Sequence, residues 1–145
     1  MLFRSYQRRL TSSNAMDFDD LIGKSVELFQ RFPESKLRYR SRFKHILVDE
    51  YQDTNQAQYQ WIKELVGTEA DGFPVAELCV VGDADQSIYA FRGANIRNIL
   101  QFEADYQSAR TILLEQNYRS TQNILSAANA VIGNNEGRKI GRAHV

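Results

Sequence analysis

The stretch KHILVDEYQDTN (residues 44–55) joins a short apolar run directly to a dense polar cluster. The run Ile46–Val48 is too short for a helix and stops at Asp49 and Glu50, which is the pattern of a buried strand. ELCVVGDADQ (residues 77–86) repeats this arrangement, because the apolar run Leu78–Val81 ends at the polar turn Gly82–Asp83. Such strands, separated by helical patterns, predict an α/β fold with a mainly parallel sheet.

Amphipathic segments on both sides of these strands predict helices. Apolar residues recur at helical spacing from Asp17 to Phe32, and Pro33 ends the pattern. The other predicted elements are a helix at Glu34–Arg42, a helix capped by Asp53 or Thr54, a third strand at Thr111–Leu114 and a helix opened by Ser120 or Thr121.

Composition leaves the function open. The 145 residues carry 18 basic and 18 acidic side chains, so no global positive charge points to nucleic acid. The basic stretch from Lys36 to Lys44 is predicted to be solvated surface. Cys79 lies inside an apolar run and is predicted to be buried. No apolar run is long enough to span a bilayer and no signal peptide is recognisable, so we expect a cytoplasmic protein without a membrane partner.

The polar residues after the two strands are the candidate site. Ligands of parallel sheets bind beyond the carboxyl ends of the strands, where Asp49, Glu50 and the segment Gly82–Gln86 lie. Adjacent carboxylates suit a magnesium–nucleotide site, since a hard cation prefers oxygen and a second carboxylate can activate water. A bare pair of acids is more often a solvated strand end, so the longer motif must decide.

Three motifs decide it. DEYQDTN (residues 49–55), VGDADQSIYAFRGA (residues 81–94) and LLEQNYRS (residues 113–120) resemble the second, third and fourth motifs of superfamily 1 helicases of the UvrD/Rep/PcrA group, in the family's order. The flanking segments at residues 14–22 and 123–132 are similar to family segments too. The resemblance covers nearly all of residues 6–138 and implies a partial RecA-like P-loop NTPase lobe with flanking helices.

The resemblance implies an ATP and Mg²⁺ site and a DNA-contacting loop. Tyr89, Phe91 and Arg92 would contact single-stranded DNA, with the aromatic rings stacked on bases. Tryptophan is usual where Phe91 stands, and an isolated aromatic residue more often packs in a core. The implied nucleotide roles are Mg²⁺ binding by Asp49, polarisation of the attacking water by Glu50, γ-phosphate sensing by Gln86 with Gln52 in its network, adenine stacking by Tyr118 and an arginine finger at Arg119.

The expected organisation has five parts. Both ends match the two strands of one sequencing-library adapter when written as codons, so residues 1–5 and 140–145 are expected to be foreign tails. Between them we expect the end of an inserted helical subdomain at 6–43, the later half of a first RecA-like lobe at 44–116 and the start of a second lobe at 117–139.

The chain has no match to G-x-x-x-x-G-K-[ST], the loop that cradles nucleotide phosphates. We therefore expect a segment of an ATP-dependent 3′–5′ DNA helicase of repair or replication that is inactive alone. Its expected partners are single-stranded DNA, single–double-strand junctions and repair accessory proteins. Two alternatives remain open: a non-catalytic single-strand-binding module, and part of a RecB/AddA-type helicase–nuclease.

Overall fold

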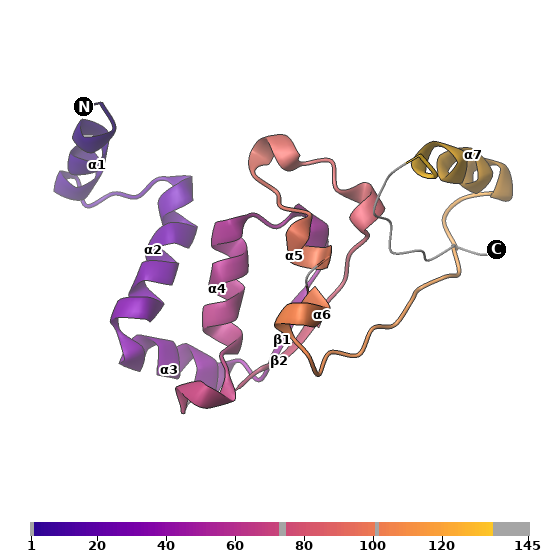
Figure 1. Cartoon of the computed structure of the whole chain (residues 1–145). Helices are drawn as coiled ribbons and strands as arrows, with labels where there is room; N and C mark the ends of the chain where they lie inside the picture. Colours follow the sequence, from indigo (N-terminus) through magenta and orange to yellow (C-terminus); the bar gives the residue numbers. More distant parts are fainter. Residues whose placement is uncertain (1, 73–74, 101, 135–145) are drawn as a thin grey trace.

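The computed structural model describes residues 2–72, 75–100 and 102–134, in which helices alternate with a small sheet (Figure 1). The longer elements are α1 (Leu2–Ser12), α2 (Phe18–Arg31), α3 (Pro33–Arg42), β1 (His45–Val48), α4 (Gln56–Val66), β2 (Glu77–Val80) and α7 (Gln122–Ile132). Shorter turns are η1 (Tyr51–Asp53), η2 (Glu69–Asp71), η3 (Ala84–Gln86), η4 (Ala90–Arg92), α5 (Arg97–Leu100) and α6 (Phe102–Asp105).

The two central strands pair in parallel, as the sequence predicts. His45 pairs with Glu77 and Val48 with Val80, so both strands end at the same edge. Backbone hydrogen bonds continue past this edge, from Val81 N to Val48 O (2.8 Å) and from Tyr51 N to Val81 O (2.9 Å). The polar segments after β1 and β2 therefore start side by side, which confirms an α/β arrangement with a parallel sheet.

One face of the sheet forms the core. Tyr51, Ile62 and Val66 are buried, and the inward-facing strand residues pack against them together with α5 and α6. The opposite face is open within the described residues, where Leu47 is 77% exposed and its cross-strand neighbour Cys79 is exposed. The prediction of a buried Cys79 is wrong, because helix α4 covers only the face that Cys79 does not share.

Helices α2 and α4 begin where local side chains satisfy their first amide groups. Asp17 caps α2 by accepting a hydrogen bond from Asp20 N (2.9 Å), at the predicted boundary. Helix α4 is capped by Asn55, which accepts from Gln58 N (2.9 Å). The predicted cap at Asp53 or Thr54 is wrong by one or two positions, because residues 51–53 form η1 and Thr54 closes that turn.

The basic stretch of α3 is not all solvated surface. Arg40 is 2% exposed, and its Nη2 donates to Asp71 Oδ2 at 2.9 Å. Gly67, which ends α4 with φ 78°, lies against this guanidinium, and a Cβ at Gly67 would stand 1.2 Å from Arg40 Nη2. The predicted exposure fails at Arg40, because its partner lies across the loop that follows α4.

The chain beyond α6 departs from prediction at one element. Residues 111–114 form no strand, and their apolar side chains are exposed, with Leu114 at 81%. The predicted third strand is wrong, since an extended segment needs a neighbouring strand edge for its hydrogen bonds and the described structure supplies none here. Thr121 then begins α7, as predicted. Helices α1 and α7 lie at opposite ends of the molecule (Figure 1).

The ends of the chain add two facts. Of the two predicted foreign tails, residues 140–145 lie outside the described residues, and residues 2–5 belong to α1. Across the described part of the chain, no helix has the length and apolar character that crossing a membrane requires.

Candidate functional site

The site begins at the turn that follows β1. Asp49 and Glu50 leave the sheet edge exposed, and Glu50 takes a left-handed backbone conformation (φ 49°, ψ 43°). This region is rare for residues other than glycine and costs about 1–2 kcal/mol. The Asp49 carboxylate stabilises the turn by accepting a hydrogen bond from Glu50 N at 2.9 Å. The chain then enters η1 directly.

Gln52, which is 1% exposed, joins this turn to the one after β2. Its Nε2 donates to Glu50 Oε2 at 2.6 Å, and its Oε1 accepts from Asp83 N at 3.1 Å. Asp83 Oδ2 in turn accepts from Gln86 Nε2 at 2.9 Å. Glu50, Gln52, Asp83 and Gln86 thus form one hydrogen-bonded chain across the two strand ends, which brings three predicted site residues together.

Gly82 is required by the close approach of Gln52. A Cβ at position 82 would stand 2.6 Å from Gln52 Oε1 and 3.1 Å from Tyr51 N. Real Cβ atoms do not approach that closely, so a larger residue would displace the Gln52 carboxamide from Asp83. The hydrogen bond between Asp83 N and Gln52 therefore requires glycine at position 82.

An open hollow lies over these groups. It is wide enough for a polar ligand to reach Glu50 and Gln86, both of which are exposed. Its lining residues are Glu50, Gln52, Asp53, Asp85, Gln86, Ile88 and Tyr89.

The donor chemistry fits a magnesium–nucleotide complex. Asp49 is exposed beside Glu50, and both offer carboxylate oxygen at the sheet edge. Within the described residues no group of three or more histidine, cysteine, aspartate or glutamate side chains is placed to hold a metal ion. Mg²⁺ does not need such a group, because it usually keeps several waters and binds through one or two carboxylates plus substrate phosphates. Asp49 is the residue that would hold it.

The three predicted DNA-contacting residues form a cluster next to the hollow. The Tyr89 and Phe91 rings lie 5.8 Å apart between centroids. The guanidinium carbon of Arg92 lies 5.0 Å from the Tyr89 centroid and 5.5 Å from that of Phe91. Phe91 is 77% exposed, so core packing does not explain it. An exposed ring can stack on a base, and a neighbouring arginine can contact a phosphate.

Tyr118 and Arg119 lie apart from this arrangement. Tyr118 is 92% exposed, and neither residue lines the hollow. Asn117 orders their turn, since its Oδ1 accepts from Arg119 N and Ser120 N, each at 2.9 Å. The structure therefore brings Glu50, Gln52 and Gln86 together at the hollow. It places Asp49 next to Glu50 but not in the lining of the hollow, and it leaves Tyr118 and Arg119 apart.

Sequence reasoning did not assign a role to Asp83, which lies between Gln52 and Gln86 in the hydrogen-bonded chain. Its signal was present, because Asp83 lies in the polar turn after β2, as Asp49 lies in the turn after β1. Exposed Asp83 also caps η3 by accepting from Asp85 N at 2.9 Å. One carboxylate thus fixes both the turn and the Gln86 side chain.

Two tyrosines of the core, buried Tyr51 and partly buried Tyr59, have raised pKa values. Burial raises the pKa of Tyr51 well above its usual range. Burial first, and then the hydrogen bond to Asp105 (2.9 Å), raises the pKa of Tyr59 to about 12. Both phenols therefore stay protonated to a higher pH than an exposed tyrosine does.

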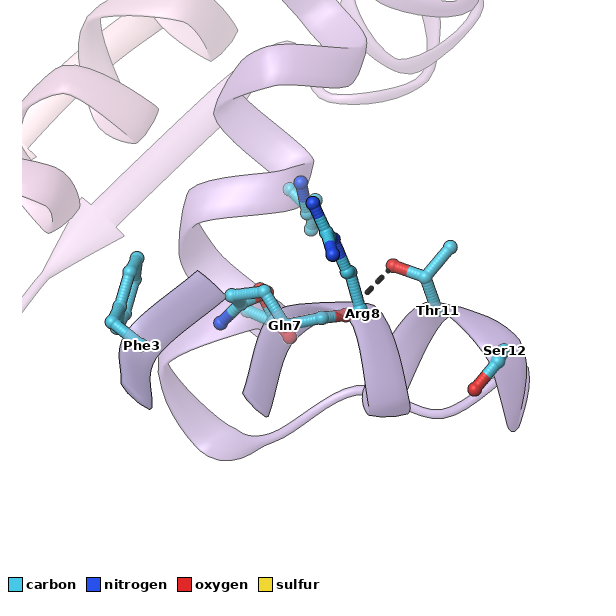
Figure 2. Close-up of a pocket in the computed structure, with 7 residues that line it drawn as sticks. Phe3, Gln7, Arg8, Thr11 and Ser12 are labelled. Carbon is cyan, nitrogen blue, oxygen red and sulfur yellow. Dashed lines mark hydrogen bonds between the residues drawn. The ribbon is translucent and has the colours of Figure 1, made fainter. Parts of the chain in front are cut away.

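A second hollow lies between α1 and α2, away from the strand ends. Figure 2 shows the α1 side chains that face it, with Thr11 Oγ1 donating to Gln7 O at 2.9 Å. Its lining side chains are not joined into a polar network like that of Gln52. They are Phe3, Gln7, Arg8, Thr11, Ser12, Asp20 and Lys24.

Comparisons with known proteins give a consistent result. The model of the UvrD/REP helicase N-terminal domain matches residues 1–107. Over 139 residues the chain is 67% identical to "ATP-dependent DNA helicase UvrD1" of Mycobacterium tuberculosis, and over 142 residues it is 63% identical to the protein of that name from Mycobacterium leprae. It is 55% identical over 138 residues to "ATP-dependent DNA helicase PcrA" of Staphylococcus aureus. Each match covers 95% of this chain, which spans 18% of the length of these relatives.

Proposed function

Because this chain belongs to the UvrD/REP helicase family, we propose that it is the part of an ATP-driven DNA helicase that couples nucleotide hydrolysis to single-strand contact. One observation carries the proposal. The hydrogen-bonded chain from Glu50 through Gln52 and Asp83 to Gln86 ends beside the cluster of Tyr89, Phe91 and Arg92.

In the proposed mechanism Glu50 holds the attacking water and accepts its proton. The hydrogen bond from Gln52 keeps the Glu50 carboxylate in place, so little reorganisation is needed at the moment of reaction. Asp83 holds the Gln86 carboxamide, which contacts the terminal phosphate. Bound at Asp49, magnesium would neutralise phosphate charge.

Tyr118 and Arg119 complete the site from a second lobe. Their distance from the hollow supports this division, since an adenine-stacking ring and an arginine finger act only when the two lobes close over ATP. Residues 44–116 then belong to a first RecA-like lobe, and the segment from residue 117 opens a second. The phosphate-cradling loop comes from another part of the protein, and residues 1–145 alone do not hydrolyse ATP.

The substrate we propose is single-stranded DNA and its junctions with duplex, tracked 3′ to 5′ in bacterial repair or replication. The protein then acts in the cytosol and nucleoid, and repair proteins are its accessory partners. A non-catalytic binding module is less well supported, because a chain that only bound DNA would not need Glu50 and Gln86 joined in one network. A RecB/AddA-type subunit differs by a nuclease domain, which sequencing beyond this segment would reveal.

The test is Glu50→Gln in the complete helicase that carries this segment. Glutamine can still accept the hydrogen bond from Gln52 but cannot take a proton, so ATP binding should persist while turnover falls about 10²- to 10⁴-fold. The measurements are nucleotide affinity and steady-state ATP hydrolysis with single-stranded DNA present.

The matched control is Glu77→Gln. Glu77 is an exposed carboxylate at the opposite end of β2, paired with His45, and its loss should leave turnover within about two-fold of the unaltered protein. Near-normal turnover in Glu50→Gln would overturn the proposed role of Glu50.

A further inference from the structure

A buried polar contact joins the turn after β1 to helix α5. Thr54 is 8% exposed and Asn98 is 6% exposed. Asn98 Nδ2 lies 3.1 Å from Thr54 O and 3.1 Å from Thr54 Oγ1. A buried carboxamide is costly when unpaired, so this two-acceptor contact fixes α5 against the turn.

Thr54 belongs to the same short turn as the proposed catalytic carboxylate. Its backbone N donates to Tyr51 O at 3.2 Å, and its Oγ1 donates to the same carbonyl at 2.7 Å. The η1 turn that Thr54 closes begins directly after Glu50. A group that holds Thr54 therefore also holds the end of the turn that carries Glu50 and Gln52.

Asn98 lies just after the loop that carries the aromatic cluster. Asn98 N donates to Asn95 O at 2.9 Å, and Asn95 N donates to Thr54 O at 3.0 Å. Ala94 pairs with Asn55 in an isolated antiparallel bridge. The far end of the loop with Tyr89 and Phe91 is thus fastened beside Thr54.

The near end of this loop is fastened to the same turn. Asp83 N donates to Gln52 Oε1 at 3.1 Å, and Ser87 Oγ donates to Gln52 O at 3.4 Å. The loop of residues 83–95 is therefore clamped at both ends to residues 52–55. A displacement of η1 must carry the aromatic cluster with it as long as both clamps hold.

We propose that Asn98, through its bonds to Thr54, is a positioning residue that makes ATP turnover respond to single-stranded DNA. The inference rests on the proposed function and extends it to a residue outside the site. Neither Thr54 nor Asn98 lines the hollow, so both act through the turn and not on the ligand. Without the Asn98 side-chain bonds, only the backbone contacts of Ala94 and Asn95 hold the far clamp, so the aromatic cluster moves Glu50 less when it binds a base.

The experiment compares basal and single-strand-stimulated ATP hydrolysis in the complete helicase that carries this segment, with a homopolymeric DNA strand as the probe. Asn98→Ala should lower the ratio of stimulated to basal rate about ten-fold, with the basal rate falling no more than about two-fold. Thr54→Val keeps the shape of the side chain but removes both the acceptor for Asn98 and the donor to Tyr51 O, and it should lower the ratio about three-fold. Thr54→Ser keeps the hydroxyl and should restore the ratio to within about two-fold.

Phe29→Leu is the control for stability. Phe29 is buried in α2, 4% exposed, and packs on Tyr39 away from the site. Thermal unfolding shows whether Phe29→Leu and Asn98→Ala lose similar stability. Phe29→Leu should lose stability but keep the ratio of stimulated to basal ATP hydrolysis. The inference is overturned if Phe29→Leu lowers the ratio as much as Asn98→Ala, or if Asn98→Ala lowers basal and stimulated rates equally.

Two further outcomes separate the inference from its basis. If single-stranded DNA stimulates the unaltered protein and Asn98→Ala has the same ratio of stimulated to basal rate, the inference alone is overturned. An unaltered protein that hydrolyses ATP without any response to single-stranded DNA overturns the proposed function, and the inference with it.

Discussion

Glu50 combines backbone strain with a fixed carboxylate. Its left-handed conformation is one of two positive-φ conformations at non-glycine residues in the described chain, the other being Asn14. Asparagine enters this region readily, but glutamate does so only where the surroundings compensate for the strain. Asp49 and Gln52 supply that compensation through hydrogen bonds on either side of Glu50. The position of the carboxylate is therefore set before any ligand binds.

Phe91 offers a sharp test of the proposed DNA contact. Phe91→Ala in the complete helicase should weaken binding of single-stranded DNA about 5- to 150-fold, because stacking is worth about 1–3 kcal/mol per base. Fluorescence anisotropy with a labelled strand measures this affinity directly.

Phe18→Ala is its control. Phe18 is 90% exposed on α2, so both variants remove a solvent-exposed ring but only one lies in the proposed interface. Equal affinity losses in the two variants would argue against stacking by Phe91.

Among the elements, η1 is short but contacts several parts of the molecule. Three residues, Tyr51–Asp53, separate the strained Glu50 from Thr54, and Gln52 within them bonds to both strand ends. Tyr51 lies at the centre of the core. This short turn thus connects packing, the proposed nucleotide site and the aromatic loop.

The loop after α4 allows a comparison of two glycines. Gly67→Ala should lower the free energy of unfolding by about 2–5 kcal/mol, from left-handed strain plus displacement of the buried Arg40 from Asp71. Gly72→Ala should cost only the strain, about 1–2 kcal/mol, because Gly72 has φ 68° and no atom near its absent Cβ. Chemical denaturation measures both. Equal losses would show that Arg40 makes no contribution at Gly67.

Local patterns predicted the elements that local forces determine. Asp17 and the helical spacing after it were sufficient for α2, and the apolar runs that stop at Asp49 and Gly82 were sufficient for both strands. The cap of α4 was misplaced because nothing in the sequence announced that η1 would use Thr54. The strand predicted at residues 111–114 failed because apolar pattern alone does not supply a pairing edge.

The sequence motifs named residues of the candidate site but did not predict the hydrogen bonds that join them. The motifs identified Glu50, Gln52 and Gln86 as candidates. The bond from Asp83 N to Gln52 depends on a residue 31 positions away and on the missing side chain of Gly82. The burial of Arg40 likewise depends on Asp71, 31 residues further on. Long-range partners of this kind have no local signature.

At the scale of the whole molecule, the chain divides at its extended segment. The sheet, α4 and the site lie on one side of residues 110–117, and α7 lies at the far end (Figure 1). Ile124 and Val131 of α7 are 60% and 72% exposed, as expected of a helix without its packing partners in the described structure.

Limited proteolysis of the 145-residue chain should show this division. Trypsin should cut first after Arg110, which is exposed and lies between α6 and α7, because proteases need extended, unpaired backbone. Buried Arg40 in α3 should be cut late. Mass spectrometry of the earliest fragments identifies the sites, and a first cut within α2, α3 or α4 would contradict the proposed division.

The open face of the sheet gives the chain a natural attachment point. Cys79 is the chain's single cysteine, is exposed, and lies in β2 on the face opposite α4. A thiol-reactive fluorophore or spin label would therefore attach at one defined place, in the middle of the strand that leads to Asp83 and Gln86. No cysteine has to be introduced or removed in this chain, so spectroscopy can follow its sheet without altering the groups at the strand ends.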